Sequence, residues 1–106
     1  MKKKVVINVA GQIGQIMASV SHDGETLHRL ITEALQEKRL VILDFTDIDL
    51  VTSSFLNASI GQLYNQYDQL FLDKYLKFEN LKPVEEATLK RVQEWAQNYF
   101  KNNKAV

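Results

Sequence analysis

Residues 40–63 read LVILDFTDIDLVTSSFLNASIGQL, and this stretch decides the fold. It opens with an apolar run, residues 40–43, which is followed by Asp44 and Phe45. Continuous apolar runs of this kind are typical of strands that are covered on both faces in a parallel sheet. We therefore predict that residues 40–43 form the central strand of such a sheet.

A helix is predicted shortly after this strand. Thr52 or Ser53 can cap it, because a side-chain hydroxyl accepts a hydrogen bond from an unpaired backbone N–H at a helix start. The helix should end between Gln69 and Lys74. Its apolar stripe consists of Leu56, Ile60, Leu63, Tyr67 and Leu70. The small residues that would let a neighbouring element approach closely are Ala58, Ser59 and Gly61.

Two further strands are predicted on either side of this stretch. Residues 4–9 are rich in β-branched side chains, and residues 75–79 alternate between polar and apolar side chains. Both patterns favour strands. Residues 11–23 fit a short strand, a helical turn or a loop, and the sequence leaves these alternatives open.

Two further helices complete an alternating order of strands and helices. One opens at Asp23-Gly24, and another begins near Pro83, which suits a first helical turn. The apolar stripe of the first consists of Leu27, Leu30, Ile31, Ala34 and Leu35. The order predicts a small α/β sandwich with a mixed, mostly parallel sheet of about four strands and about three helices. We expect a single domain over residues 1–102 and a polar tail over residues 103–106.

Composition excludes several classes of function. The 106 residues include 13 Lys and Arg against 13 Asp and Glu, so the formal net charge is zero. Neither nucleic acid nor a membrane is expected as a partner, because a neutral chain has no net field toward either. The lack of cysteine excludes disulfides, thiolate zinc sites and cysteine nucleophiles. The apolar run after Lys4 is too short for a signal peptide, and no run approaches the ~18 residues of a membrane span. We therefore expect a cytoplasmic protein.

Asp44, Asp47 and Asp49 follow the central strand, at the end where α/β folds place ligands. They could hold Mg²⁺ or accept a phosphoryl group, as the aspartate after an apolar strand does in response-regulator receivers. Receivers also need an acidic pair after the first strand and a lysine after the last, and the sequence offers neither. We therefore interpret the three as loop carboxylates in local turns, and we expect no metal and no cofactor.

The glycines and histidines form weaker patterns. Gly11 and Gly14, with no Walker lysine after them, favour ordinary turns over a phosphate-binding loop. His22 and His28, in a chain without cysteine, make a poor transition-metal site. No nucleophile motif supports a catalytic triad. We interpret the histidines as loop and helix-surface residues.

Thr52, Ser53 and Ser54 place three hydroxyls in a row at a predicted helix start. They can act simply as caps. They are also a suitable phosphorylation site, because a phosphoryl group there gains from the helix dipole and from free N–H groups. Both interpretations remain open from the residue types alone.

Residues 40–63 resemble the core of STAS domains, the family named after sulfate transporters and anti-sigma factor antagonists. The bacterial STAS-like branch of small proteins is the closest match. The residues that carry the resemblance are Asp44-Phe45, Ser54-Phe55, Gly61 and the Asp23-Gly24 lead into the preceding helix.

The resemblance implies a protein-interaction role without enzymatic activity. Anti-sigma factor antagonists bind an ATPase of the histidine-kinase-like fold, which phosphorylates a serine in an Asp-Ser-Ser-Gly motif of the antagonist and so releases itself. On this sequence the motif falls on residues 52–55, and Ser53 takes the place of the phosphorylated serine. Thr52 stands in the position of the motif's aspartate, and Phe55 in that of its glycine.

The resulting hypothesis is a regulatory partner-switching module that binds a histidine-kinase-like ATPase or another anti-sigma-type protein. Its phosphorylation site would be Ser53, with Ser54 and Thr52 as secondary candidates. The predicted partner surface consists of Asp47, Asp49, Thr52, Ser53, Phe55 and Asn57.

Three alternatives belong to other classes. The first is a small-ligand or nucleotide sensor, in which residues 11–23 close over the ligand. The second is a metal-dependent enzyme built on the Asp44 cluster, against which we favour a structural carboxylate. The third is a homodimer formed through Trp95, Tyr99 and Phe100, of which at least two are expected to pack in the core.

Overall fold

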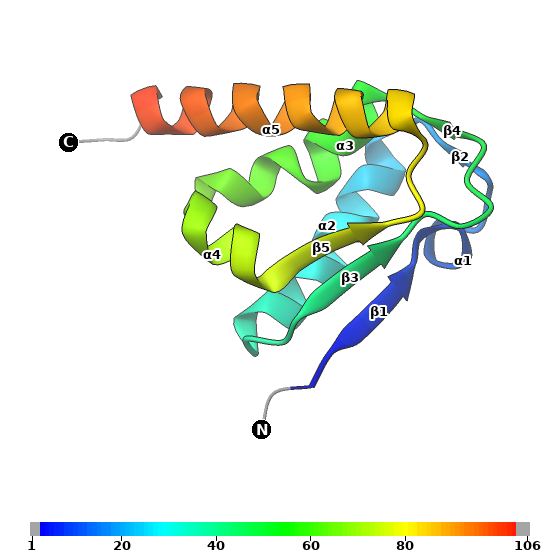
Figure 1. Ribbon diagram of the computed structural model, residues 1–106, viewed down its shortest axis with the longest axis horizontal. Coiled ribbons are helices and arrows are strands. Elements are labelled where there is room, and N and C mark those ends of the chain that lie inside the picture. Colours follow the sequence, from blue (N-terminus) through cyan, green and yellow to red (C-terminus); the bar gives the residue numbers. More distant parts are fainter. Residues whose placement is uncertain (1–2, 104–106) are drawn as a thin grey trace.

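The computed structural model describes residues 3–103 and has the predicted α/β class (Figure 1). The main sheet contains β1 (Val5–Asn8), β3 (Val41–Asp44) and β5 (Leu76–Glu79), in the order β1-β3-β5, and both pairs are parallel. The predicted central strand is therefore confirmed. Two short strands, β2 (Met17–Ala18) and β4 (Leu50–Val51), form a separate parallel pair, so the strands divide between two sheets.

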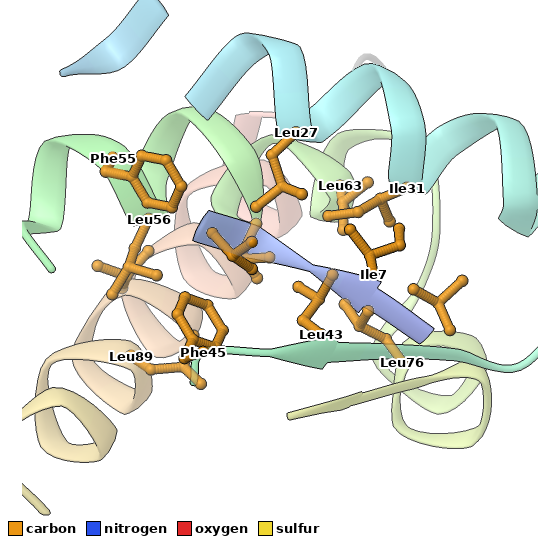
Figure 2. Close-up of a cluster of buried hydrophobic side chains, with 14 of the residues drawn as sticks. Ile7, Leu27, Ile31, Leu43, Phe45, Phe55, Leu56, Leu63, Leu76 and Leu89 are labelled. Carbon is orange, nitrogen blue, oxygen red and sulfur yellow. The ribbon is translucent and has the colours of Figure 1, made fainter. Parts of the chain in front are cut away.

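One face of the main sheet packs against helices and forms the core. Figure 2 shows the side chains of Ile7, Leu43 and Leu76 pointing toward α2 (Ser21–Gln36) and α3 (Ser53–Ser59). Leu43 lies between the other two in the strand order, and all three are buried. The largest fully buried side chains are Phe45, Phe55, Leu27, Ile31, Leu35, Leu43, Leu56, Ile60 and Leu63.

The central strand is buried on both faces, as predicted, although Figure 1 shows no helix over the other face of the sheet. Val6, Ile42 and Lys77 are register partners on this open face. Val6 is 53% exposed and Lys77 is exposed, whereas Ile42 between them is only 8% exposed. Neighbouring strands thus shield Ile42, and this explains why the apolar run is continuous without a second helical layer.

The ambiguous residues 11–23 contain parts of three elements. The short helix α1 (Val9–Ile13) is capped by Asn8, whose side chain accepts a hydrogen bond from Gly11 N at 2.7 Å. It ends at Gly14, whose φ of 74° is a left-handed backbone conformation that glycine adopts without strain. Strand β2 follows, and α2 then begins at Ser21, slightly earlier than the predicted Asp23-Gly24 opening.

Helix α2 carries the predicted stripe, and Gly24 lies within its buried face. Leu27, Ile31, Ala34 and Leu35 are buried, which confirms the helical spacing. A Cβ atom on Gly24 would lie 2.7 Å from the backbone oxygen of Phe55 and 2.8 Å from the Cβ of Ala58. The glycine therefore permits the close approach of α3 that the small residues of that helix had indicated.

The predicted long middle helix is broken into three pieces: α3, the 3₁₀ helix η1 (Gly61–Asn65) and α4 (Gln69–Tyr75). Asp68 explains the new start, because its side chain accepts a hydrogen bond from Phe71 N at 2.8 Å and so caps α4. Leu70, which was predicted to be on the buried stripe, is 80% exposed, since the break changes the direction in which α4 faces.

The last helix, α5, runs from Pro83 to Asn103 and begins where the sequence predicted. Leu89, Val92 and Ala96 are buried against the rest of the domain. Trp95 and Tyr99 are 54% and 45% exposed, so the expectation that at least two of Trp95, Tyr99 and Phe100 pack in the core is wrong. Their rings instead stack on one another along the helix, with centroids 4.9 Å apart.

Helix α5 extends one residue into the predicted tail, and residues 104–106 of that tail lie outside the described residues. Within residues 3–103, no helix is both long enough and apolar enough to cross a membrane.

The close packing at Gly24 gives the first prediction. Gly24→Ala should lower the free energy of unfolding by about 1–3 kcal/mol, because the added methyl group meets the backbone of α3, which cannot easily move. Chemical denaturation measures this change. Glu25→Ala, at an exposed position of the same helix, is the control and should be nearly neutral. A neutral Gly24→Ala would mean that α2 and α3 can separate freely.

Candidate functional site

The structural features of interest gather at one end of the molecule. In Figure 1 the arrowheads of β1, β3 and β5 point toward the end where β2, β4 and the start of α5 lie. Thr52, which begins α3, donates its backbone N–H to Ala18 of β2 at 3.0 Å. The side chain of Lys82, just before α5, donates to the backbone oxygen of Asp49 at 3.4 Å. The hydroxyls, the loop carboxylates and the short sheet are therefore neighbours.

Asp44 is a structural carboxylate that links β3 to the end of β5. Its Oδ1 accepts hydrogen bonds from the Thr46 hydroxyl at 2.6 Å, from Asn80 Nδ2 at 2.8 Å and from Thr46 N at 3.0 Å. The Thr46 hydroxyl, followed by the Asn80 amide, holds the pKa of Asp44 below its usual 3.8. Asn80 adopts a φ of 64°, which an asparagine tolerates, and this places its amide within reach. The favoured interpretation of Asp44 is confirmed.

Asp47 and Asp49 lie on the surface and do not join Asp44 in a cluster. Asp47 has a φ of 67°, as expected of a turn carboxylate. Asp49 Oδ1 lies 4.0 Å from Lys82 Nζ, an exposed and therefore weak ion pair. Within residues 3–103, no group of three or more His, Asp or Glu side chains is arranged to hold a metal ion.

Thr52 is the cap of α3 and is tied to the preceding chain. Its hydroxyl accepts a hydrogen bond from Phe55 N at 3.2 Å and donates one to the backbone oxygen of Ser19 at 3.0 Å. A phosphoryl group on this oxygen would replace the proton that bonds Ser19 and so would break that bond. The structure therefore favours the capping interpretation for Thr52.

Ser53 and Ser54 differ from Thr52, because both are exposed and neither hydroxyl has a hydrogen-bond partner among residues 3–103. Phe55 is fully buried in the core, as Figure 2 shows, so its ring cannot belong to the predicted partner surface. Asn57 is half-buried one turn further along α3, and its Oδ1 is a buried acceptor without a partner in the same range. Ser53 and Asn57 therefore remain accessible members of the predicted surface.

Exposed apolar side chains surround the short sheet, and the sequence analysis did not identify them. Met17 and Leu50 are register partners, so they emerge on the same face of the pair. Ile16 and Val20 flank β2, and all four side chains are exposed. We name these four residues the β2–β4 patch. A signal was present in the sequence, since apolar residues in the ambiguous 11–23 segment had no predicted partner.

The glycines and histidines have structural roles in the described residues. Gly11 and Gly14 belong to α1 and its end, as turn glycines, and not to a phosphate-binding loop. His22 is exposed at the start of α2. His28 is half-buried, with Nδ1 3.2 Å from the backbone oxygen of Ser59, so it bridges α2 and α3 and is not a simple surface residue.

A groove of about 550 Å³ separates the start of α3 from the outer face of α5. Ser53, Ser54 and Asn57 line the α3 side. The residues that line the α5 side include Thr88, Arg91 and Trp95. The sequence analysis did not identify this groove, because nothing in the local pattern relates residues 53–57 to residues 88–95.

This architecture is that of a small α/β domain whose sheet order is β1-β3-β5 and whose polar features lie where the strands end. Residues 23–86, more than half of the chain, match the family described as "STAS-like domain of unknown function (DUF4325)". The chain therefore belongs to this STAS-like family, and the resemblance found in residues 40–63 is confirmed. No curated protein and no solved structure matches the chain. The matched range extends from α2 to the first turn of α5.

The hydrogen bonds of Asp44 give the second prediction. A carboxyl titration followed by NMR should give Asp44 a pKa below 3.8, and Asn80→Gly should raise it toward that value. Glycine is chosen because it retains the positive φ of residue 80. Since the folded-state pKa is the lower one, this stabilisation is complete above pH 3.8 and is lost as the pH falls through the folded-state value. An unchanged pKa in Asn80→Gly would contradict this role for the amide.

Proposed function

We propose that this protein is a non-enzymatic regulatory module that binds a histidine-kinase-like ATPase, and that phosphorylation of Ser53 ends this contact. The observation that carries the proposal is the position of Ser53. Its exposed hydroxyl, which has no hydrogen-bond partner among residues 3–103, is separated from the end of β4 by one residue, and Leu50 of that strand belongs to the β2–β4 patch. An apolar surface beside a modifiable hydroxyl is the arrangement that a switchable interface needs.

The β2–β4 patch supports a protein partner. Single exposed apolar residues are common on soluble proteins, whereas a group of them marks an interaction surface. Met17, Leu50 and their neighbours come from two strands held in register, so the group is presented on a fixed backbone. Asp49 borders it, because its backbone N–H donates to the backbone oxygen of Ile16 at 2.8 Å, and this resembles the polar rim around the apolar centre of many interfaces.

The ATPase would supply the phosphoryl group. Ser53 Oγ would attack the γ-phosphorus of bound ATP, the bond from that phosphorus to the β-phosphate oxygen would break, and ADP would leave. The hydroxyl proton would pass to a base on the partner. The product places about two negative charges on Ser53, three positions after Leu50 of the β2–β4 patch. Burial of this charge at the contact with the partner would remove its hydration, which is strongly unfavourable, so the complex should separate.

Ser53 is preferred over its neighbours for structural reasons. Modification of Thr52 would remove the proton that its hydroxyl donates to Ser19, and so would disturb the contact that holds the start of α3 to the preceding chain. Ser54 is as free as Ser53, but it lies one residue further from β4. Modification of Ser53 changes the charge of the surface without disturbing the hydrogen bonds that form it.

The third prediction tests the switch. Tagged wild-type protein in Mg-ADP should capture a histidine-kinase-like ATPase from a lysate of the source organism, as identified by mass spectrometry. Ser53→Ala should retain this capture and Ser53→Asp should lose it. Both variants should keep the wild-type melting temperature, because the Ser53 hydroxyl makes no hydrogen bond in the described residues. Equal capture by the two variants would refute the phosphoswitch, and recovery of no ATPase would refute the partner.

The fourth prediction maps the contact surface. Leu50→Lys should reduce the captured ATPase at least about 10-fold, because a charge at the centre of a desolvated contact costs more than about 1.4 kcal/mol. Leu70→Lys is the matched control, since Leu70 is equally apolar and even more exposed but lies on α4. If the two variants lose the partner equally, or neither does, the β2–β4 patch is not the interface.

A further inference from the structure

The groove between α3 and α5 places Ser53 opposite a cation. Ser53 belongs to the α3 wall, and Arg91 belongs to the α5 wall. The two walls come from segments almost forty positions apart in the chain, and they are held together by the packing of α3 against α5, where Val92 and Ala96 are buried. The groove is therefore a product of the tertiary fold.

Arg91 has the hydrogen-bonding capacity to receive an anion. Its Nη2 donates to the hydroxyl of Thr88 at 3.3 Å, and no carboxylate within residues 3–103 forms an ion pair with it. Arg91 is also the only charged residue among those that line the groove in this part of the chain. A guanidinium has five N–H donors in a planar fork that matches a phosphoryl group. The groove thus contains a positive charge that pairs with no carboxylate of residues 3–103.

We propose that Arg91 receives the phosphoryl group of phosphorylated Ser53, so that the modified side chain folds into the groove of its own domain. This inference deepens the proposed function and rests on Ser53 as the modified residue. The phosphoryl oxygens accept hydrogen bonds from the Arg91 guanidinium, while the Thr88 hydroxyl beside it keeps its own proton on the backbone oxygen of Val84 at 3.1 Å. Phosphorylation then both removes Ser53 from the partner surface and gives the released form a stabilising contact.

The groove suits this occupant better than a free ligand. Among residues 3–103, the side chains that line it include hydroxyls and one guanidinium, and no carboxylate that would repel a phosphoryl group. Trp95, whose indole stacks on Tyr99, lines the groove one turn of α5 beyond Arg91. A phosphoryl group tethered to Ser53 needs no diffusional encounter, so a single arginine suffices where a free anion would need several donors.

The experiment uses full-length protein with phosphoserine installed at position 53 during translation, so that it needs no partner and no kinase. Phosphorus NMR then follows the second ionisation of the phosphoserine, whose ordinary pKa is about 6. In the wild type this pKa should be lowered by about 0.5 to 1, because a guanidinium favours the dianion. Arg91→Gln should return it to the ordinary value.

Two further variants make the result specific. Lys90→Gln removes a neighbouring positive charge from another side of α5, where Lys90 lines a separate hollow with Leu76, and it should leave the lowered pKa unchanged. Arg91→Lys keeps the positive charge but loses the planar set of guanidinium N–H donors, so it should lower the phosphoserine pKa by less than the wild type does. Arg91 is exposed, so these variants should fold, and the melting temperature of the unmodified forms checks this.

An equal phosphoserine pKa in the wild type and in Arg91→Gln would overturn the inference, as would an equal rise in Lys90→Gln. Neither result bears on whether Ser53→Asp loses the ATPase. Conversely, a protein that captures no ATPase can still show the Arg91-dependent pKa. The failure of this inference and the failure of the proposed function are therefore distinguishable.

Discussion

The contact between α2 and α3 at Gly24 is the constraint on which the rest of the structure depends. A side chain at this position would meet the backbone oxygen of Phe55 and the Cβ of Ala58, so only glycine allows the two helices to approach this closely. His28 adds a polar contact from α2 to the backbone oxygen of Ser59. With α3 fixed in this way, Phe55 enters the core and Ser53 is left on the surface.

Much of the fold could be predicted because its signals are local. The apolar run of residues 40–43 and the helical spacing of Leu27, Ile31 and Leu35 correspond to β3 and α2 as observed. The break between α3 and α4 was missed because the apolar stripe continues through it, while the competing cap at Asp68 is a single residue in the same stretch. Periodicity alone could not show which of the two signals prevails.

The candidate site was only partly predictable, for a different physical reason. Hydroxyls at residues 52–54 stand out in the sequence, but their roles differ through contacts with distant residues. Thr52 is held by the backbone oxygen of Ser19, and the groove of Ser53 is completed by Arg91. The burial of Phe55 likewise follows from the direction of α3 and not from its neighbours in sequence. Contacts between residues far apart in the chain leave no local pattern to read.

The residue that caps α3 also determines which of the following hydroxyls is exposed. Thr52 accepts a hydrogen bond from Phe55 N and donates one to Ser19 O, so these two bonds fix the residue at which the helix begins. Ser53, the next residue, is therefore the first with a hydroxyl that has no hydrogen-bond partner among residues 3–103. Deletion of Thr52, the one residue between β4 and α3, would bring Ser53 into the capping position and leave Ser54 as the next hydroxyl. The number of residues between β4 and α3 therefore helps to determine which serine hydroxyl a modifying enzyme can reach.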